Sequence, residues 1–307
     1  MPPNPRALVE FFARSLTSFT TSGEAFRILC TLPHPHSPST PPQPRPPQHP
    51  IRNLIVLDSS FNPPTTAHAA MVRAAAAAAS SSPSGTRILL LLAVENADKP
   101  PRPASFPLCL GMMEALGREL LLGGGDGGVS VDLGVTRMPF FHDKARAIAE
   151  SGCYGDYDGS PGGGGGGGAG GGGGGGVGEM TFLAGYDTLV RIFQPRYYGG
   201  EEGMRAALDP FFARARLRVT MRTDGEWGGR EEQEEFVREL AEEGGKLDEV
   251  GGRREWMRKV DLVDGFGGDV SSSRVRGVVR TGGYQELDGL VGGEVKAWIE
   301  REGLYRE

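Results

Sequence analysis

Blocks of apolar and polar residues alternate along this chain with the spacing of strands and helices. Two nearly continuous apolar runs, 51–57 and 87–94, have the length and composition of strands buried on both faces of a sheet. Further runs of strand length stand at 25–32, 129–135, 180–184, 217–221 and 260–263. Segments with helical composition or spacing separate them, at 5–20, 65–79, 105–122, 140–150, 186–193, 201–214, 231–243, 271–280 and 294–301. This order predicts an α/β fold of Rossmann-like type. Its parallel sheet is covered by helices on both faces, and ligands bind beyond the carboxyl ends of the strands.

Changes in composition divide the chain into parts. Residues 1–32 predict a short amphipathic helix and a strand, which we interpret as an N-terminal extension. Residues 33–50 are rich in proline, histidine and serine, and they predict an extended linker with solvated histidines. The main domain is expected over 51–307. Within it, residues 159–178 are mostly glycine and are interpreted as a disordered surface insertion. Glycine-motif matches inside such a tract say nothing about nucleotide binding.

Composition and charge limit the classes of function. The 307 residues carry a formal net charge of -6, which disfavours a general nucleic-acid binder because that binding relies on neutralising phosphates. No apolar run is long enough to predict a membrane-spanning helix. Three cysteines without a CxxC pair predict reduced thiols, not a disulfide framework or a metal site. We therefore expect a cytoplasmic or nuclear protein; acidic Glu10 and Glu24 make a mitochondrial presequence the less favoured interpretation.

A polar, proline-containing turn between the run at 51–57 and the helix at 65–79 is the strongest candidate for a functional site. Proline restricts the turn and donates no hydrogen bonds, while the N–H groups of the turn and of the helix N-terminus favour an anion. Thr65 and His68 are three residues apart, so a hydroxyl and an imidazole share one face of the first helical turn. The alternative is that Thr65 only caps the helix and that His68 is a surface histidine.

A second candidate follows the last predicted strand. Ser271, Ser272 and Ser273 precede a helix that carries Arg274 and Arg276. Serine hydroxyls cap helices and donate to phosphate oxygens, and arginine offers a planar, permanently charged fork to phosphate. Taken alone, this segment is better explained by an ordinary helix cap and a surface arginine. Together with the first candidate, it favours nucleotide binding.

The two segments resemble the signature motifs of a nucleotidyltransferase superfamily. Residues 59–68 match its GSFNPxTxxH-like segment, and residues 271–276 match its ISSTxxR-like segment. Within the superfamily, the chain resembles the nicotinamide mononucleotide adenylyltransferases, and in particular a fungal branch. Gly185 and Asp187 are similar to the Gly-x-Asp segment of that family, and 96–99 and 141–145 also resemble the fungal branch. The resemblance extends from about residue 51 to residue 305 and implies a Rossmann-like nucleotidyltransferase domain.

The resemblance also implies a reaction and a set of roles. The phosphate of nicotinamide mononucleotide would attack the α-phosphorus of ATP, giving NAD and pyrophosphate, with Mg²⁺ carried by ATP and no metal held by the protein. ATP and nicotinamide mononucleotide would be the partners, without nucleic acid or membrane; the oligomeric state is left open. The catalytic residues would be His68, Thr65 and Arg276, the ATP-binding residues Ser59, Ser60, Phe61, Gly185, Asp187, Ser272 and Ser273, and the acceptor-binding residue Lys99.

The chain departs from the family pattern at three places. Ser59 stands where the family has glycine, residues 106–110 lack an arginine that the family has, and Tyr197 and Tyr198 occupy the place of a tryptophan. These departures keep two alternatives open. One is an ATP-binding relative that acts mainly as an ATPase or a regulatory protein, and the other is nucleotidyl transfer to a different phosphorylated acceptor.

Overall fold

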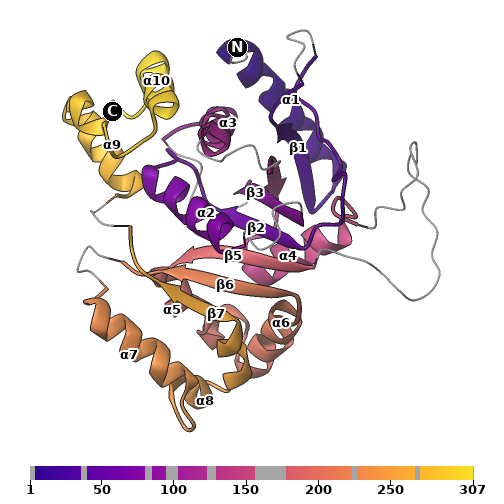
Figure 1. Ribbon diagram of the computed structural model, residues 1–307, viewed down its shortest axis with the longest axis vertical. Coiled ribbons are helices and arrows are strands. Elements are labelled where there is room, and N and C mark those ends of the chain that lie inside the picture. The colour runs from indigo at the N-terminus through magenta and orange to yellow at the C-terminus, as the bar shows by residue number, and fades with distance from the viewer. Residues whose placement is uncertain are drawn as a thin grey trace.

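The computed structural model describes residues 4–35, 40–79, 85–94, 103–122, 129–155, 178–222, 227–266 and 270–306. At its centre is one sheet with helices packed on both sides (Figure 1). Two predictions fall outside the described residues, namely Lys99 with its segment 96–99, and the glycine insertion up to residue 177. Gly178, the last residue of the expected insertion, donates its N–H to the carbonyl oxygen of Ile51 (2.9 Å) and leads directly into a strand.

The sheet has the strand order β1-β4-β3-β2-β5-β6-β7. Strands β2 to β7 are parallel, which confirms the predicted fold class. The N-terminal strand is an exception, because β1 pairs antiparallel with β4. It joins the sheet at an edge, where antiparallel pairing needs no crossover helix. The strands span Phe26–Leu32 (β1), Asn53–Asp58 (β2), Thr86–Ala93 (β3), Ser130–Thr136 (β4), Glu179–Gly185 (β5), Ala215–Thr220 (β6) and Val260–Val263 (β7).

Helices cover both faces of the sheet, as predicted, and each layer has its own apolar core. The first layer contains α1 (Pro5–Ser22), α2 (Thr66–Ala78), α3 (Phe106–Leu122), α9 (Ser272–Arg280) and α10 (Gly293–Glu302). The second contains α4 (Phe141–Glu150), α5 (Tyr186–Ile192), α6 (Glu201–Arg214), α7 (Arg230–Ala241) and α8 (Lys246–Glu249). Short 3-10 turns lie at Pro195–Tyr197, Arg254–Lys259 and Tyr284–Leu287.

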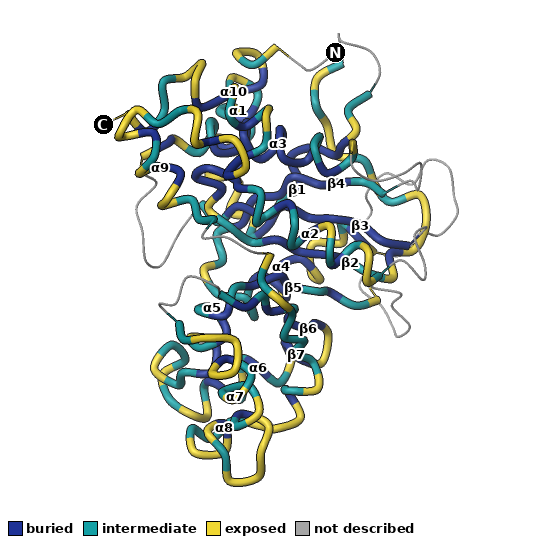
Figure 2. The backbone as a smooth tube through the Cα atoms, turned by 60° about the vertical axis from the view of Figure 1, so that its left-hand side comes forward, coloured by how far each residue is buried: buried dark blue, intermediate teal, exposed yellow. Residues whose placement is uncertain are grey.

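The central strands are buried from both sides (Figure 2). Successive residues of a strand point to opposite faces, so Ile55 and Leu57 of β2 enter the first core while Leu54 and Val56 enter the second. In β3 all residues except the last are buried. This double burial is the physical reason that the sequences of β2 and β3 read as continuous apolar runs.

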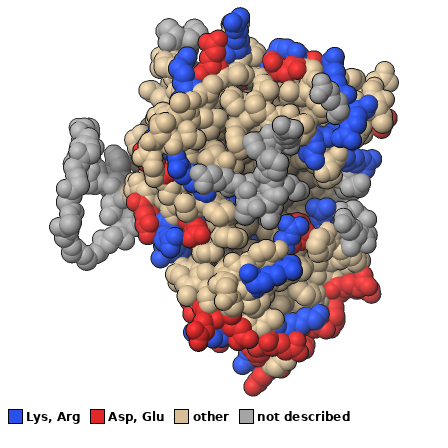
Figure 3. All heavy atoms as spheres, turned by 180° about the vertical axis from the view of Figure 1, so that it is seen from behind, with Lys and Arg blue, Asp and Glu red and all other residues tan. Residues whose placement is uncertain are grey.

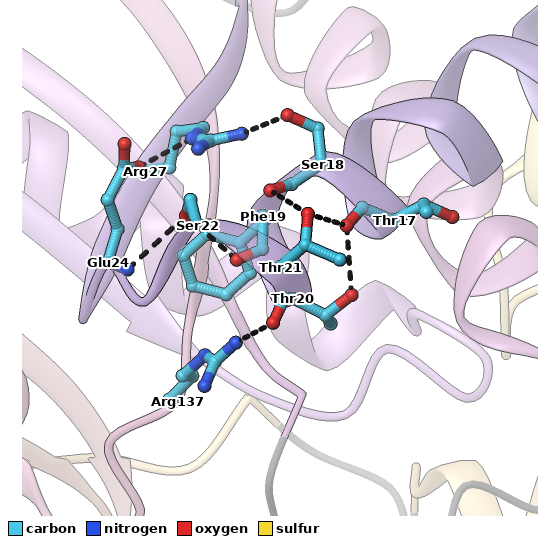
Figure 4. A network of polar contacts seen from close by, with 9 residues as sticks. All are labelled: Thr17, Ser18, Phe19, Thr20, Thr21, Ser22, Glu24, Arg27 and Arg137. Carbon is cyan, nitrogen blue, oxygen red and sulfur yellow. Dashed lines mark hydrogen bonds and ion pairs between the residues drawn. The ribbon is translucent and has the colours of Figure 1, made fainter.

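The N-terminal helix is fastened to the sheet at its carboxyl end (Figure 4). Phe19 is fully buried, and the guanidinium groups of Arg27 and Arg137 lie 5.6 and 5.7 Å from the centre of its ring. Arg27 also donates to Ser18 Oγ (3.0 Å), and Arg137 donates to the carbonyl oxygen of Thr20. Residues on β1 and just after β4 thus hold the end of α1 against the sheet.

The predicted linker after β1 is attached to the sheet by hydrogen bonds. The N–H of Thr31 donates to Gln43 O (3.1 Å), and the N–H of Arg45 donates to Thr31 Oγ1 (2.9 Å). The buried guanidinium of Arg87 donates to the Arg45 carbonyl and pairs with the fully buried Asp132 (Nε to Oδ2, 2.6 Å). Proline-rich composition could not reveal these contacts, because the linker contributes its backbone to them.

The expectation of solvated linker histidines is wrong for His34. Its Nε2 lies 3.1 Å from Oε1 of Glu114, a carboxylate with no exposed surface, and Arg118 Nε donates to the same oxygen (2.9 Å). A buried carboxylate needs such partners to offset the loss of hydration. His49 is exposed, as expected, and His36 lies outside the described residues.

Acidic side chains gather at the pole of the molecule formed by α7 and α8 (Figures 1 and 3). Residues 230–250 contain nine acidic and three basic side chains, so this segment alone accounts for a charge equal to the net -6 of the chain. The negative charge is therefore concentrated away from the turn that follows β2. In the part of the chain that the structure describes, no helix is long and apolar enough to cross a membrane.

Candidate active site

The predicted anion-binding turn lies at the carboxyl edge of the sheet, where β2 ends at Asp58 and α2 begins after Thr65. The strand β2 is flanked by β3 on one side and β5 on the other. The chain adds strands outward from β2 through β3 and β4, and then outward in the other direction from β5. Such a switch point opens a crevice at the carboxyl ends of parallel strands. We call residues 59–65 the 59–65 turn.

His68 is fixed by hydrogen bonds at both ring nitrogens. The backbone N–H of Thr65 donates to Nδ1 (3.0 Å), and Thr65 Oγ1 lies 2.7 Å from the same atom. Because Nδ1 accepts, the neutral ring carries its proton on Nε2, which lies 3.0 Å from Ser59 Oγ. The side chain of Thr65 therefore orients His68 from the inside of the turn, where it is 2% exposed.

The environment of His68 favours its neutral form. Burial lowers the pKa of the imidazole from 6.5 to about 4. The ring is only partly covered, and it packs beside Phe61 with the two ring centres 5.8 Å apart. At neutral pH, His68 thus presents a fixed N–H donor at Nε2.

Two other predicted ATP-binding residues differ in how they could contact a ligand. Ser60 is exposed. The side chain of Phe61 is fully buried in the first core, and its backbone has a φ of 47°, a left-handed conformation that is unusual for a large residue. Phe61 can therefore meet a ligand only through its backbone, and its ring serves to anchor the turn.

The second motif packs directly on the first. Ser272 Oγ donates to the carbonyl oxygen of Pro63 (2.8 Å), and Arg276 Nη1 donates to that of Asn62 (2.7 Å). Arg276 Nη2 also donates to Ser273 Oγ (3.0 Å). The segments are more than 200 residues apart, and α9 joins them by lying across the 59–65 turn. Asn62, which is 7% exposed, has a buried Oδ1 without a hydrogen-bond partner among the described residues.

Gly185 and Asp187 lie at the carboxyl end of β5, the strand next to β2. A Cβ atom on Gly185 would come within 2.6 Å of Asp187 Oδ1, so the glycine allows the carboxylate to approach the backbone. Asp187 lies 3.7 Å from a guanidinium nitrogen of Arg222. Because β5 and β2 are parallel neighbours, Gly185 and the 59–65 turn follow the carboxyl ends of adjacent strands.

Sequence reasoning missed Lys144. The side chain is only 5% exposed, and Nζ lies 2.5 Å from Oδ2 of Asp58, the last residue of β2. Lys144 shares the buried face of α4 with Ala147 and Ile148. The sequence does contain a signal for it, since this lysine stands in register with the apolar positions of an amphipathic helix. A lysine is seldom buried without a partner, so that position predicts an ion pair.

The start of α4 also brings aromatic rings to this edge. His142 stacks on Phe140 with ring centres 5.7 Å apart, and it lies 5.5 Å from the ring of Tyr198. The hydroxyl of Tyr198 donates to the carbonyl oxygen of Ile192 (2.8 Å). Of the neighbouring Tyr197 and Tyr198, it is Tyr198 whose ring lies beside that of His142.

No group of three or more histidine, cysteine, aspartate or glutamate residues in the described ranges could hold a metal ion. Asp58, the carboxylate that ends β2, is engaged by Lys144.

We compared the chain with known proteins. No family model matches the chain. A curated Schizosaccharomyces pombe protein named "Putative nicotinamide mononucleotide adenylyltransferase" is 28% identical over 259 residues, which cover 82% of this chain and 86% of the relative. The chain is thus similar to this relative along most of its length. The two segments that resemble the motifs of such enzymes meet at the 59–65 turn.

Comparison with solved structures bears on the fold alone. The Plasmodium falciparum nicotinic acid mononucleotide adenylyltransferase complexed with APC superposes with a TM-score of 0.50 at 13% identity, covering 83% of this chain and 97% of that chain. The same enzyme complexed with NaAD gives a TM-score of 0.49 at 14% identity and the same coverage. The chain thus shares the fold of the complex with APC although the sequences are only 13% identical.

Proposed function

We propose that this chain transfers AMP from ATP to nicotinamide mononucleotide, giving NAD and pyrophosphate. The observation that carries the proposal is the packing of α9 on the 59–65 turn, which brings Ser272 and Arg276 to the same edge as His68. The S. pombe relative is named for this activity, and its match covers most of both chains, which supports the assignment.

The phosphates of ATP fit the donors of this edge. The N-terminus of α2 directs the positive end of its helix dipole at this edge, while the N–H of Thr66 is held by the carbonyl oxygen of Leu290 (2.9 Å). Arg276 has five N–H donors, and its two hydrogen bonds with Asn62 and Ser273 leave donors for phosphate oxygens. Ser272 and Ser273 stand at the first turn of α9 and complete a clamp on the leaving pyrophosphate.

His68 is placed to stabilise charge as the reaction proceeds. An oxygen of the acceptor phosphate forms a bond to the α-phosphorus of ATP, and the bond from that phosphorus to the oxygen bridging to the β-phosphate breaks. Pyrophosphate takes the electron pair. The nucleophile is already an anion, so the protein supplies alignment and electrostatic stabilisation and needs no side-chain nucleophile. The neutral ring donates its Nε2 proton in a hydrogen bond without becoming charged.

The remaining half of ATP is assigned to the end of β5. Asp187 accepts from ribose hydroxyls, and Gly185 allows the backbone to approach the sugar. Mg²⁺ enters with ATP and offsets the charge of its phosphates. Ser59 and Ser60 lie at the start of the 59–65 turn, where their hydroxyls reach a phosphate. Lys99 is proposed to bind the acceptor phosphate.

One assay tests the proposal. The protein is incubated with Mg²⁺, ATP and nicotinamide mononucleotide, and the formation of NAD and pyrophosphate is followed. The expected result is equal amounts of the two products. Release of ADP and inorganic phosphate without NAD contradicts the proposal and favours the ATPase alternative. A parallel reaction with nicotinic acid mononucleotide, the acceptor named for the Plasmodium enzyme, separates the two pyridine acceptors.

A further inference from the structure

Lys144 is a buried lysine beside the 59–65 turn with no task in the mechanism above. It extends from the N-terminal end of α4, and its ammonium group lies 2.5 Å from Asp58 Oδ2 and 5.6 Å from the centre of the Phe141 ring. The helix α4 follows β4, which is two strands away from β2 in the sheet order. This ion pair therefore joins distant parts of the chain at the carboxyl edge.

Asp58 places a negative charge directly before an anion-binding turn. It is the last residue of β2, and the turn begins at Ser59, one Cα–Cα step of about 3.8 Å away. Over a step this short, salt screens a charge only in part, because the Debye length at physiological ionic strength is about 8 Å. Without a counterion, its field would oppose the binding of a phosphate there.

We infer that Lys144 is a positioning residue that neutralises Asp58 and thereby keeps the 59–65 turn able to bind phosphate. The inference rests on the proposed function for the identity of the phosphate donor. Arg276, on the other side of the turn, has a different role. Its hydrogen bonds in the described structure go to neutral groups, the carbonyl of Asn62 and the hydroxyl of Ser273, so its positive charge remains available to a ligand.

A direct contact between Lys144 and phosphate would give the opposite double-mutant result. If Lys144 acts only by cancelling the charge of Asp58, then removing both charges restores phosphate binding. If its ammonium binds phosphate itself, then removing Asp58 as well restores nothing. The Asp58→Asn and Lys144→Met changes therefore form a double-mutant cycle. The sign of the coupling energy between them distinguishes charge cancellation from direct phosphate binding.

The experiment measures dissociation constants by calorimetry for Mg²⁺–ATP and, separately, for inorganic tripolyphosphate. We expect Lys144→Met to weaken both affinities about tenfold, the scale of one uncancelled charge at this distance. Lys144→Arg and the double variant Asp58→Asn/Lys144→Met should stay within about threefold of the wild type. Lys296→Met is the matched control, because Lys296 also pairs with an aspartate (Asp288, 2.7 Å) but lies on α10; it should leave both affinities unchanged.

Two results would overturn the inference. Wild-type affinity in Lys144→Met would show that the charge of Asp58 does not act on the turn, and weak binding by the double variant would show that Lys144 is itself a phosphate ligand. If Lys144→Met does not fold, Asp58→Asn is compared with the double variant. The inference expects Asp58→Asn to bind phosphate more tightly than the double variant, which stays at wild-type affinity; equal affinities for the two would overturn it. A wild-type protein that binds tripolyphosphate but forms no NAD would contradict the proposed function and leave this inference intact.

Discussion

Ser272 donates a 2.8 Å hydrogen bond to the carbonyl oxygen of Pro63, although the two residues are 209 positions apart in the chain. This contact joins the two motifs that separately suggested phosphate binding. It also means that the geometry of the 59–65 turn depends on α9, which is formed near the end of the chain.

Removing this contact should affect ATP binding more than folding. Ser272→Ala deletes one hydrogen bond, so we expect the free energy of unfolding to fall by about 1 kcal/mol and the KM for ATP to rise severalfold. The matched control is Ser271→Ala, because Ser271 caps α9 by accepting the N–H of Arg274 (3.2 Å) without touching the turn. It should cost a similar stability, about 1 kcal/mol, with an unchanged KM. An equal rise in KM for both variants would contradict the assigned contact.

His68→Ala should lower turnover by more than about tenfold, which corresponds to about 1.4 kcal/mol of transition-state stabilisation. The reason is the loss of the N–H donor at Nε2; the variant also removes the acceptor of the Thr65 N–H. Initial rates of NAD formation at saturating substrates measure this effect. His49→Ala in the exposed part of the linker is the control, with wild-type turnover expected. Unchanged turnover in His68→Ala would reject the role of His68.

The low pKa of His68 also predicts how stability depends on pH. Burial lowers the pKa to about 4 in the folded protein, whereas the unfolded chain takes up a proton near 6.5. Between these values the unfolded state binds more protons, so the contribution of His68 is complete above 6.5 and is lost as the pH falls towards 4. Denaturant unfolding across this window should show a shallower decline for His68→Gln than for the wild type. Parallel declines for the two proteins would contradict the lowered pKa.

The buried pair of Arg87 and Asp132 should matter for folding alone. Arg87→Met leaves a fully buried carboxylate that keeps only its bonds from Thr31 Oγ1 (2.6 Å) and the hydroxyl of Tyr154 (2.8 Å). We expect the free energy of unfolding to fall by about 3–5 kcal/mol. The KM for ATP should not change below the melting temperature, because the pair lies at the amino ends of the strands, at the edge opposite to the site.

The control for that variant is Arg6→Met, which breaks the exposed pair with Glu10 on α1. Such surface pairs contribute about 0–1 kcal/mol, so little change in unfolding is expected. A small effect of Arg87→Met, similar to that of Arg6→Met, would show that the buried network is dispensable.

Gly185→Ala tests the assignment of the ribose site. The new Cβ would meet Asp187 Oδ1 at 2.6 Å and displace this carboxylate, so the KM for ATP should rise while the melting temperature changes little. Gly277→Ala on α9 is the control, since no atom lies within 4 Å of its Cβ position. Alanine there should stabilise the helix by about 0.5–1 kcal/mol and leave the KM unchanged. An unaltered KM in Gly185→Ala would remove Asp187 from the site.

The sequence determined the fold class and most of the elements. Strands buried on both sides need apolar residues at every position, which made β2 and β3 recognisable, and the spacing of helices between strands predicted a parallel sheet. The candidate phosphate-binding turn was also readable, because a polar, proline-containing segment between a buried strand and a helix is a local pattern.

The tertiary structure alone decided what depends on contacts between distant segments. The antiparallel attachment of β1, the attachment of the linker through its backbone and the burial of His34 against Glu114 all involve partners whose identity no local pattern contains. The same is true of the site. His68 and α9 were visible in the sequence, but only packing across the sheet could place Ser272 on Pro63 and Lys144 on Asp58, because each of these hydrogen bonds joins elements that are not neighbours in the chain.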